Sequence, residues 1–118
     1  MANYRTLTTV EQWNEAFRAS AEKPLLVFKH STRCPISAGA YEEWGKWLED
    51  SADLGIGHVL VRVIEERPVS NAIEEATGVK HASPQVILVK DGKAVWNTSH
   101  WNITYSSLDE QVRQHCGK

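Results

Sequence analysis

The chain has 118 residues, a formal net charge of −2 and 42% hydrophobic residues, so it is long enough for one domain with a modest core. Its acidic and basic residues are evenly spread, which argues against a surface for nucleic acid or for an anionic membrane. No apolar run approaches membrane-spanning length, and the opening MANYRTLTT lacks the apolar stretch of a signal peptide. We therefore expect one cytoplasmic domain over residues 1–118.

The first half of the sequence predicts two helices separated by a buried strand. Thr9 opens a capping-box pattern, and apolar residues at intervals of three and four continue a helix to about Ala21. Residues 25–28, which read LLVF, form a short apolar run typical of a strand covered on both faces. Pro35 suits the first turn of a second helix, whose apolar face continues to about Asp50.

The second half predicts a strand, a short helix, a hairpin and a final helix. In chain order these elements are residues 58–64, a helix from Pro68 to a left-handed cap at Gly78, strands 85–90 and 93–98, and a helix capped by Thr104. The Asp91-Gly92 pair between two apolar strands is a strong hairpin signal.

The order of these elements, α and then β-α-β-α-β-β-α, predicts the fold class. Two parallel strands joined by a crossover helix, followed by a helix, an antiparallel hairpin and a closing helix, indicate an α/β domain. We expect a four-stranded mixed sheet with helices on both faces. This is the element order of a thioredoxin-like fold with one extra N-terminal helix.

The segment HSTRCP, residues 30–35, carries the chemistry. Cys34 falls between a predicted strand and a predicted helix, where unpaired N–H groups and the helix dipole favour a thiolate. Arg33 and His30 add positive or potentially positive charge, so we expect a nucleophilic thiolate near neutral pH. A free cysteine is more often a small buried apolar residue, but a place between Arg33 and Pro35 at a helix start favours the reactive interpretation.

The motif around this cysteine reads C-P-I-S rather than C-x-x-C. Ser37 occupies the place of a second cysteine, and its hydroxyl does not attack sulfur usefully, although it can donate a hydrogen bond to the Cys34 thiolate. Two cysteines in all are too few for a disulfide scaffold. Cys116, near the C-terminal end, is either a distant resolving cysteine or a tail thiol with no role, and the second interpretation is favoured.

Ser83 and Pro84 directly precede the third predicted strand. In a thioredoxin-like sheet this strand lies beside the strand that leads to Cys34. A cis Ser83–Pro84 bond there would expose backbone groups that can pair with a substrate chain. Spacing alone favours the alternative, an ordinary trans proline at the start of a strand.

Four stretches together, HSTRCPIS, SPQV, DGKAVW and SHWNIT, resemble the bacillithiol-linked monothiol bacilliredoxin family, a thioredoxin-fold group marked by T-C-P-I. The resemblance covers nearly the whole chain, although Arg33 stands where the family has threonine. It implies a bacterial redox-homeostasis enzyme that reduces mixed disulfides between protein cysteines and bacillithiol, a glucosaminyl-malate thiol. It implies no bound cofactor: bacillithiol is the low-molecular-weight co-substrate, bacillithiolated client proteins are the partners, and a bacillithiol disulfide reductase is a further candidate partner.

The resemblance also implies roles for individual residues. Cys34 is the attacking nucleophile, and Pro84, after Ser83, is the substrate-orienting cis proline. His100 and Trp101 are candidates to contact the sugar or the malate of bacillithiol. Three cations are candidates to meet the malate carboxylates: Arg33, Lys29 and His81. Two alternatives stay open, namely that the Trp101 ring fills the gap between the hairpin and the last helix, and that His100 is a half-exposed loop residue with no special role.

A different class of function also fits a lone reactive cysteine. In a non-catalytic redox sensor or binding module, Cys34 is oxidised or capped once and signals through a partner, without turnover. A peroxidase is disfavoured because the T-x-x-C pattern would need Ser31 in place of threonine. No metal is expected, because the candidate ligands lack paired C-x-x-C or H-x-x-x-H spacing. Those candidates are His30, Cys34, His81 and Cys116.

Overall fold

Five strands form one mixed sheet in the computed structural model, which describes residues 4–116. The strands are β1 (Arg5–Thr6), β2 (Leu25–His30), β3 (Gly57–Arg62), β4 (Gln85–Lys90) and β5 (Lys93–Ser99). Their order across the sheet is β1-β3-β2-β4-β5. β3 is parallel to both β1 and β2, whereas β4 is antiparallel to β2 and β5 is antiparallel to β4. The mixed sheet predicted from the element order is confirmed.

The sheet has one strand more than the four predicted from the sequence. Arg5 and Thr6 of β1 pair with Val59 and Leu60 of β3, and the Leu7 N–H donates to the Leu60 carbonyl at 2.9 Å. A strand of two polar residues produces no alternation of apolar side chains, so it leaves no periodic signal in the sequence.

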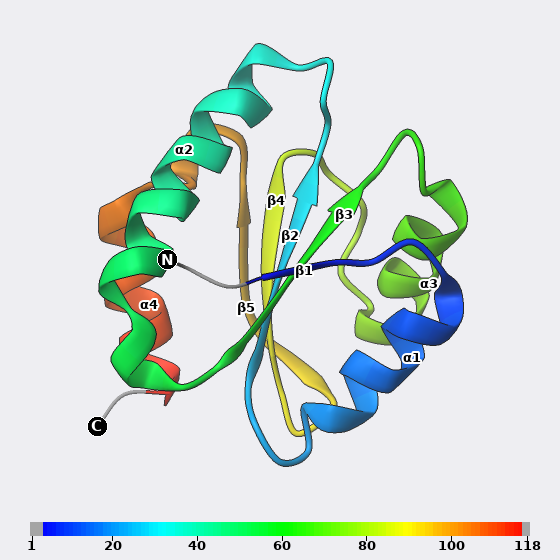
Figure 1. Cartoon of the computed structure of the whole chain (residues 1–118), viewed down its shortest axis with the longest axis horizontal. Helices are drawn as coiled ribbons and strands as arrows, with labels where there is room; N and C mark the ends of the chain where they lie inside the picture. Colours follow the sequence, from blue (N-terminus) through cyan, green and yellow to red (C-terminus); the bar gives the residue numbers. More distant parts are fainter. Residues whose placement is uncertain (1–3, 117–118) are drawn as a thin grey trace.

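Helices cover both faces of the sheet (Figure 1). They are α1 (Val10–Ala19), α2 (Pro35–Asp50), α3 (Arg67–Thr77) and α4 (Tyr105–Cys116), with short 3-10 helices η1 (Ala52–Leu54) and η2 (His100–Asn102). α1 and α3 lie on one face, and α2 and α4 lie on the other. Within residues 4–116, no helix combines the length and the apolar character needed to cross a membrane.

Side-chain alternation along β2 explains why the core has two layers. Leu25 and Val27 are buried in the cluster beneath α1 and α3. Leu26 and Phe28 are buried in the cluster beneath α2 and α4. Burial of each such side chain contributes about 1.5–3 kcal/mol. Because both faces are covered, the strand reads as a continuous apolar run rather than as alternating apolar and polar residues.

Several predicted helix ends and turns are confirmed. Thr9 Oγ1 accepts the Gln12 N–H at 3.1 Å, and Gln12 Oε1 accepts the Thr9 N–H at 3.2 Å, which completes the capping box of α1. Gly78 ends α3 with a φ of 72°. Asp91 and Gly92 join β4 to β5 with φ values of 56° and 71°, as a tight hairpin turn requires.

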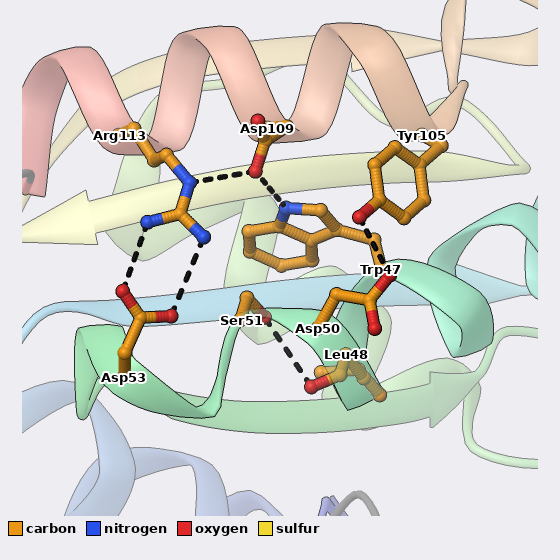
Figure 2. A network of polar contacts seen from close by, with 8 residues as sticks. All are labelled: Trp47, Leu48, Asp50, Ser51, Asp53, Tyr105, Asp109 and Arg113. Carbon is orange, nitrogen blue, oxygen red and sulfur yellow. Dashed lines mark hydrogen bonds and ion pairs between the residues drawn. The ribbon is translucent and has the colours of Figure 1, made fainter.

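A polar network fastens α4 to α2 and η1 (Figure 2). Arg113 Nε donates to Asp109 at 2.7 Å, and its terminal nitrogens donate to the two carboxylate oxygens of Asp53 at 3.0 and 3.3 Å. Asp109 also accepts the indole N–H of the fully buried Trp47 at 3.2 Å. The network therefore connects a core side chain of α2 to the outer surface of the last helix.

Candidate active site

Four loops meet at one end of the sheet, beyond the carboxyl ends of the parallel strands β2 and β3. The pairs His30–Arg62, Lys29–Gln85 and Gln85–Ser99 place the ends of β2, β3 and β5 and the start of β4 side by side. The loops after β2 and β3, the loop before β4, and η2 after β5 therefore share this edge. The residues predicted for the site that lie there are Cys34, Arg33, Ser83, Pro84, His100 and Trp101.

Cys34 is the residue that caps the N-terminus of α2. Its backbone is extended, with φ −108° and ψ 121°, and Pro35 follows as the first helical residue. The Cys34 N–H donates to the Ser31 carbonyl at 3.3 Å, and the Cys34 carbonyl accepts the Ala38 N–H at 3.1 Å. The side chain is half-buried. Cys34 therefore lies at the positive end of the α2 dipole, next to first-turn N–H groups that have no partner within the helix.

Ser37 makes different contacts from those predicted. It is fully buried, its Oγ accepts the Ser31 N–H at 3.0 Å and lies 2.7 Å from His30 Nδ1, and no hydrogen bond joins it to Cys34 within the described residues. The buried hydroxyl has taken the nearest backbone and ring partners, so it shapes the loop between β2 and α2. Burial lowers the pKa of His30, partly offset by the charge of Glu65. The imidazole is therefore neutral near pH 7, and the positive charge expected from it is not supplied there.

Two loops that carry charged side chains border Cys34. Thr32 Oγ1 donates to Glu65 Oε2 at 3.1 Å, which joins the loop after β2 to the loop after β3. A hydrogen bond from its own backbone lowers the pKa of the Glu65 carboxyl, and Thr32 and the positive charges of Arg62 and Arg33 lower it further. Arg33 is exposed, so its guanidinium is open to an anionic ligand, with the Glu65 carboxylate as a competing anion.

The Ser83–Pro84 bond is cis, as expected from the thioredoxin-like arrangement. Pro84 is buried, and its carbonyl accepts the His100 N–H at 3.0 Å. This hydrogen bond joins the loop before β4 to η2. The Ser83 hydroxyl is buried and has no hydrogen-bond partner among residues 4–116.

η2 presents the largest exposed aromatic side chain of the described residues. Trp101 is 75% exposed, so its ring does not fill a gap between the hairpin and the last helix, and that alternative is wrong. His100 is exposed and has a φ of 55°. A residue with a side chain rarely adopts this left-handed conformation. The conformation turns the chain sharply after β5 and directs it across α2, against which η2 packs.

Lys29 is too deeply buried to meet the malate carboxylates, the role for which it was a candidate, whereas His81 is half-buried. Lys29 is fully buried, and its Nζ donates to the Ser70 carbonyl and contacts His81 Nδ1, both at 3.3 Å. The sequence does contain the signal for this position. Lys29 follows Leu25 and Val27 at intervals of two, so its side chain must enter the same core face. The alternation is hidden because the preceding residues, LLVF, are apolar on both faces of the strand.

Cys116 lies at the opposite end of the sheet from Cys34. The neighbouring His115 carbonyl accepts a hydrogen bond from Lys90 Nζ at 2.8 Å, and Lys90 ends β4, whose first residue pairs with Lys29. A strand of six residues spans about 17–20 Å, whereas a disulfide requires Cα atoms within about 7 Å. Burial raises the pKa of the Cys116 thiol. Cys116 therefore cannot resolve a Cys34 adduct within this fold.

The described residues also bear on metal binding. No group of three or more His, Cys, Asp or Glu side chains in residues 4–116 could hold a metal ion.

Solved structures share the whole architecture. A structure provisionally described as an oxidoreductase with a thioredoxin fold is 34% identical in sequence, with a TM-score of 0.80, and the match covers 91% of each chain. Thioredoxin of Fasciola hepatica is 16% identical with a TM-score of 0.76, covering 94% of this chain and 98% of that one. Thioredoxin of Trypanosoma brucei brucei is 12% identical with a TM-score of 0.80, covering 99% and 94%. The last two likenesses bear on the fold alone.

The fold and the cysteine at the start of α2 together define a thioredoxin-fold thiol–disulfide oxidoreductase. A family model described as monothiol bacilliredoxin BrxC matches residues 5–108. The chain belongs to the monothiol bacilliredoxin family, and the resemblance found in the sequence motifs is confirmed.

Proposed function

We propose that this protein removes bacillithiol from mixed disulfides of protein cysteines, with Cys34 as the nucleophile. The observation that carries the proposal is a lone half-buried cysteine at the N-terminus of α2 in a chain of the monothiol bacilliredoxin family. Position 37 is a buried serine, and Cys116 lies a strand length away. An adduct formed at Cys34 therefore waits for an external thiol.

The reaction proceeds through two thiol–disulfide exchanges. The Cys34 thiolate attacks the bacillithiol sulfur of the client, a new S–S bond forms at Cys34, and the client cysteine leaves as a thiolate that takes a proton from water. A second bacillithiol thiolate then attacks the bacillithiol sulfur of the adduct, releases Cys34 and forms bacillithiol disulfide. The two electrons that reduce the client thus come from two bacillithiol molecules, and a bacillithiol disulfide reductase would restore them. A reducing compartment such as the cytoplasm suits this cycle.

The loops at this edge of the sheet supply the other roles. The backbone at Ser83 and Pro84 pairs with the client chain, and Ser37 keeps the cysteine loop in shape through Ser31 and His30. Arg33 faces the malate carboxylates. The exposed ring of Trp101 and the adjacent His100 contact the glucosamine, because an exposed aromatic face stacks well on a sugar and gains burial when it does.

A transfer assay tests the proposal. The full chain is mixed with a client protein that carries bacillithiol on one cysteine, and both proteins are weighed intact by mass spectrometry at successive times. We expect the bacillithiol mass to move to Cys34 and the client thiol to return, with multiple turnovers when free bacillithiol is added. Parallel reactions with glutathione and coenzyme A mixed disulfides measure the preference for the small thiol.

Two variants act as matched controls for this assay. Cys34→Ala should abolish transfer, whereas Cys116→Ala should retain it because that thiol lies at the far end of the sheet. Transfer that persists in Cys34→Ala contradicts the proposal. A single round of adduct formation without turnover in excess bacillithiol would indicate a redox sensor instead, and equal rates with all three small thiols would contradict the bacillithiol preference.

A further inference from the structure

The loop that leads to Pro84 rests on a buried ionisable side chain. Lys29 of β2 is fully buried on the α3 face of the sheet. A lysine loses its hydration when it is buried. Burial at this position therefore costs free energy unless nearby groups accept hydrogen bonds from the ammonium group. Its Nζ finds two acceptors at 3.3 Å, the Ser70 carbonyl of α3 and His81 Nδ1 of the loop before β4.

Three elements make hydrogen bonds to residues 80 and 81 of this loop. The His81 ring contacts Lys29 of β2, and the backbone N–H of His81 donates to Glu74 Oε1 of α3 at 3.1 Å. The neighbouring Lys80 carbonyl accepts Gln85 Nε2 of β4 at 3.0 Å. Gln85 and Lys29 are also direct partners across the β2–β4 ladder. Residues 80 and 81, four and three positions before the cis proline Pro84, are thus held by contacts from β2, α3 and β4.

We infer that Lys29 and His81 are positioning residues that hold residues 79–84 in place, and so fix the Ser83–Pro84 edge against which a disulfide-linked client binds. This inference deepens the proposed function and rests on it for the identity of the bound partner. The hydrogen bond between Lys29 and His81 forms in one protonation state, in which the charged Lys29 donates and the neutral His81 accepts at Nδ1. A second proton would put two cations 3.3 Å apart, and loss of the lysine proton would weaken the donor.

The surroundings set the pH range in which that state exists. Burial lowers the pKa of Lys29 to about 8, with a partial offset from Glu74. Burial also lowers the pKa of His81, and the charges of Lys29 and Arg67 lower it further against the opposing charge of Glu74. The facing groups on α3 are thus Glu74, Arg67 and the uncharged Ser70, and the facing group on β4 is the uncharged Gln85. Client affinity should be greatest between the two pKa values and should fall on either side.

The test measures binding without chemistry. The full chain carrying Cys34→Ser is titrated with a short peptide whose cysteine is joined to bacillithiol, between about pH 5 and pH 9.5, and Kd is recorded. Hydrogen exchange at residues 79–85 of the unliganded protein is measured over the same range. In this parent protein we expect Kd to be lowest near neutral pH and to rise above pH 8 and again in acid, with exchange following the same course.

Substitutions in the parent separate the two groups. Lys29→Met keeps the side-chain length but removes the charge and the donor, so Kd should rise about tenfold near neutral pH and the alkaline rise should disappear. His81→Asn keeps an acceptor oxygen near the place of Nδ1 but does not titrate. Its affinity near neutral pH should therefore be retained, and only the rise of Kd in acid (the acid limb of the profile) should disappear. Val27→Ala, on the same strand and face, should lower stability and leave the shape of both profiles unchanged.

Each outcome decides the inference. If Lys29→Met binds and exchanges like the parent, or if His81→Asn keeps the acid limb, the positioning role is wrong. The His81 variant decides alone if Lys29→Met does not fold. If the parent does not bind the bacillithiolated peptide at all, the proposed function fails, and the exchange profiles still decide whether these two residues hold the loop.

Discussion

Two basic side chains on opposite faces of the sheet, the fully buried Lys29 and the half-buried His58, differ in what surrounds them. Lys29, on the α1 and α3 face, has two hydrogen-bond acceptors and lies beside the loop that carries the cis proline. His58, on the α2 and α4 face, lies near the start of β3 and contacts the rings of Trp44 and Trp47, with centroids 6.4 and 5.7 Å away. His58 Nδ1 is buried and has no partner among the described residues.

The same physical effect, loss of hydration on burial, leaves these two residues in different charge states at neutral pH. Burial lowers the pKa of His58 to about 4, helped by the charge of Lys23, so the ring is neutral at pH 7. Burial lowers the pKa of Lys29 only to about 8, so its amine is still mostly charged there. The neutral His58 ring packs against two tryptophans and has no charge that needs a partner. A charge kept inside the core is costly, and its place at the edge of the active site is the reason to assign it a role.

The largest expected effect concerns His58 in acid. The unfolded chain binds a proton at His58 below about pH 6.5, whereas the folded chain binds it only near pH 4. The folded state therefore holds fewer protons in this window, and the free energy of unfolding falls as the pH drops from about 6.5 to 4, by at most roughly 3 kcal/mol. Urea denaturation at several pH values measures the slope.

Two variants show whether the acid slope belongs to His58. His58→Phe removes the titrating group and should flatten the slope between pH 6.5 and 4. Leu26→Ala, the partner of His58 across the β2–β3 pair, should lower stability about equally at every pH. A His58→Phe slope as steep as that of the wild type would show that the acid sensitivity lies elsewhere.

The second effect is a gain of stability in Lys29→Met. Removing a buried charge while keeping the side-chain length should raise the free energy of unfolding at pH 7 by about 1–2 kcal/mol. The wild type itself becomes more stable between pH 8 and 10.5, because the folded state gives up the Lys29 proton before the unfolded chain does. The advantage of methionine should therefore shrink over that range, as urea denaturation at pH 7 and 9.5 would measure. A variant less stable than the wild type at pH 7 would show that the contacts to Ser70 and His81 outweigh the burial of the charge.

The contrast between the two faces also shows what the sequence can predict. The helices, the hairpin and four of the five strands follow from apolar periodicity, caps and turn residues, because these are local properties of the chain. Asp91-Gly92 and Gly78 identify their turns for the same reason, since each needs a positive φ. β1 is missed because its two residues form a strand only through pairing with β3.

The site is predictable to the extent that it depends on position along the chain. Cys34 falls at a helix start because a strand precedes it and a proline follows it, and both facts are local. The hydrogen-bond partners of Ser37 and Lys29 cannot be read from position along the chain. They depend on the direction in which a buried hydroxyl or amine points within the fold, and the partner groups lie on other elements. Sequence separations of 41 and 52 residues divide Lys29 from its two acceptors.

The smallest expected effect concerns the exposed network on the His58 face. Arg113 bonds Asp109 and Asp53 at the surface, with about a third of its side chain exposed to solvent. Because water screens these charges and their side chains lose freedom when they pair, Arg113→Gln should lower the urea midpoint only slightly at low salt. In 1 M salt most of that difference should vanish, while Arg18→Gln on the exposed side of α1 controls for the loss of one positive charge. An Arg113→Gln loss that is large and independent of salt would mean that Asp109 needs the arginine to hold the buried Trp47 indole in place. The α2 and α4 face would then also depend on a charged side chain that supports a core residue, and the contrast with the Lys29 face would be smaller.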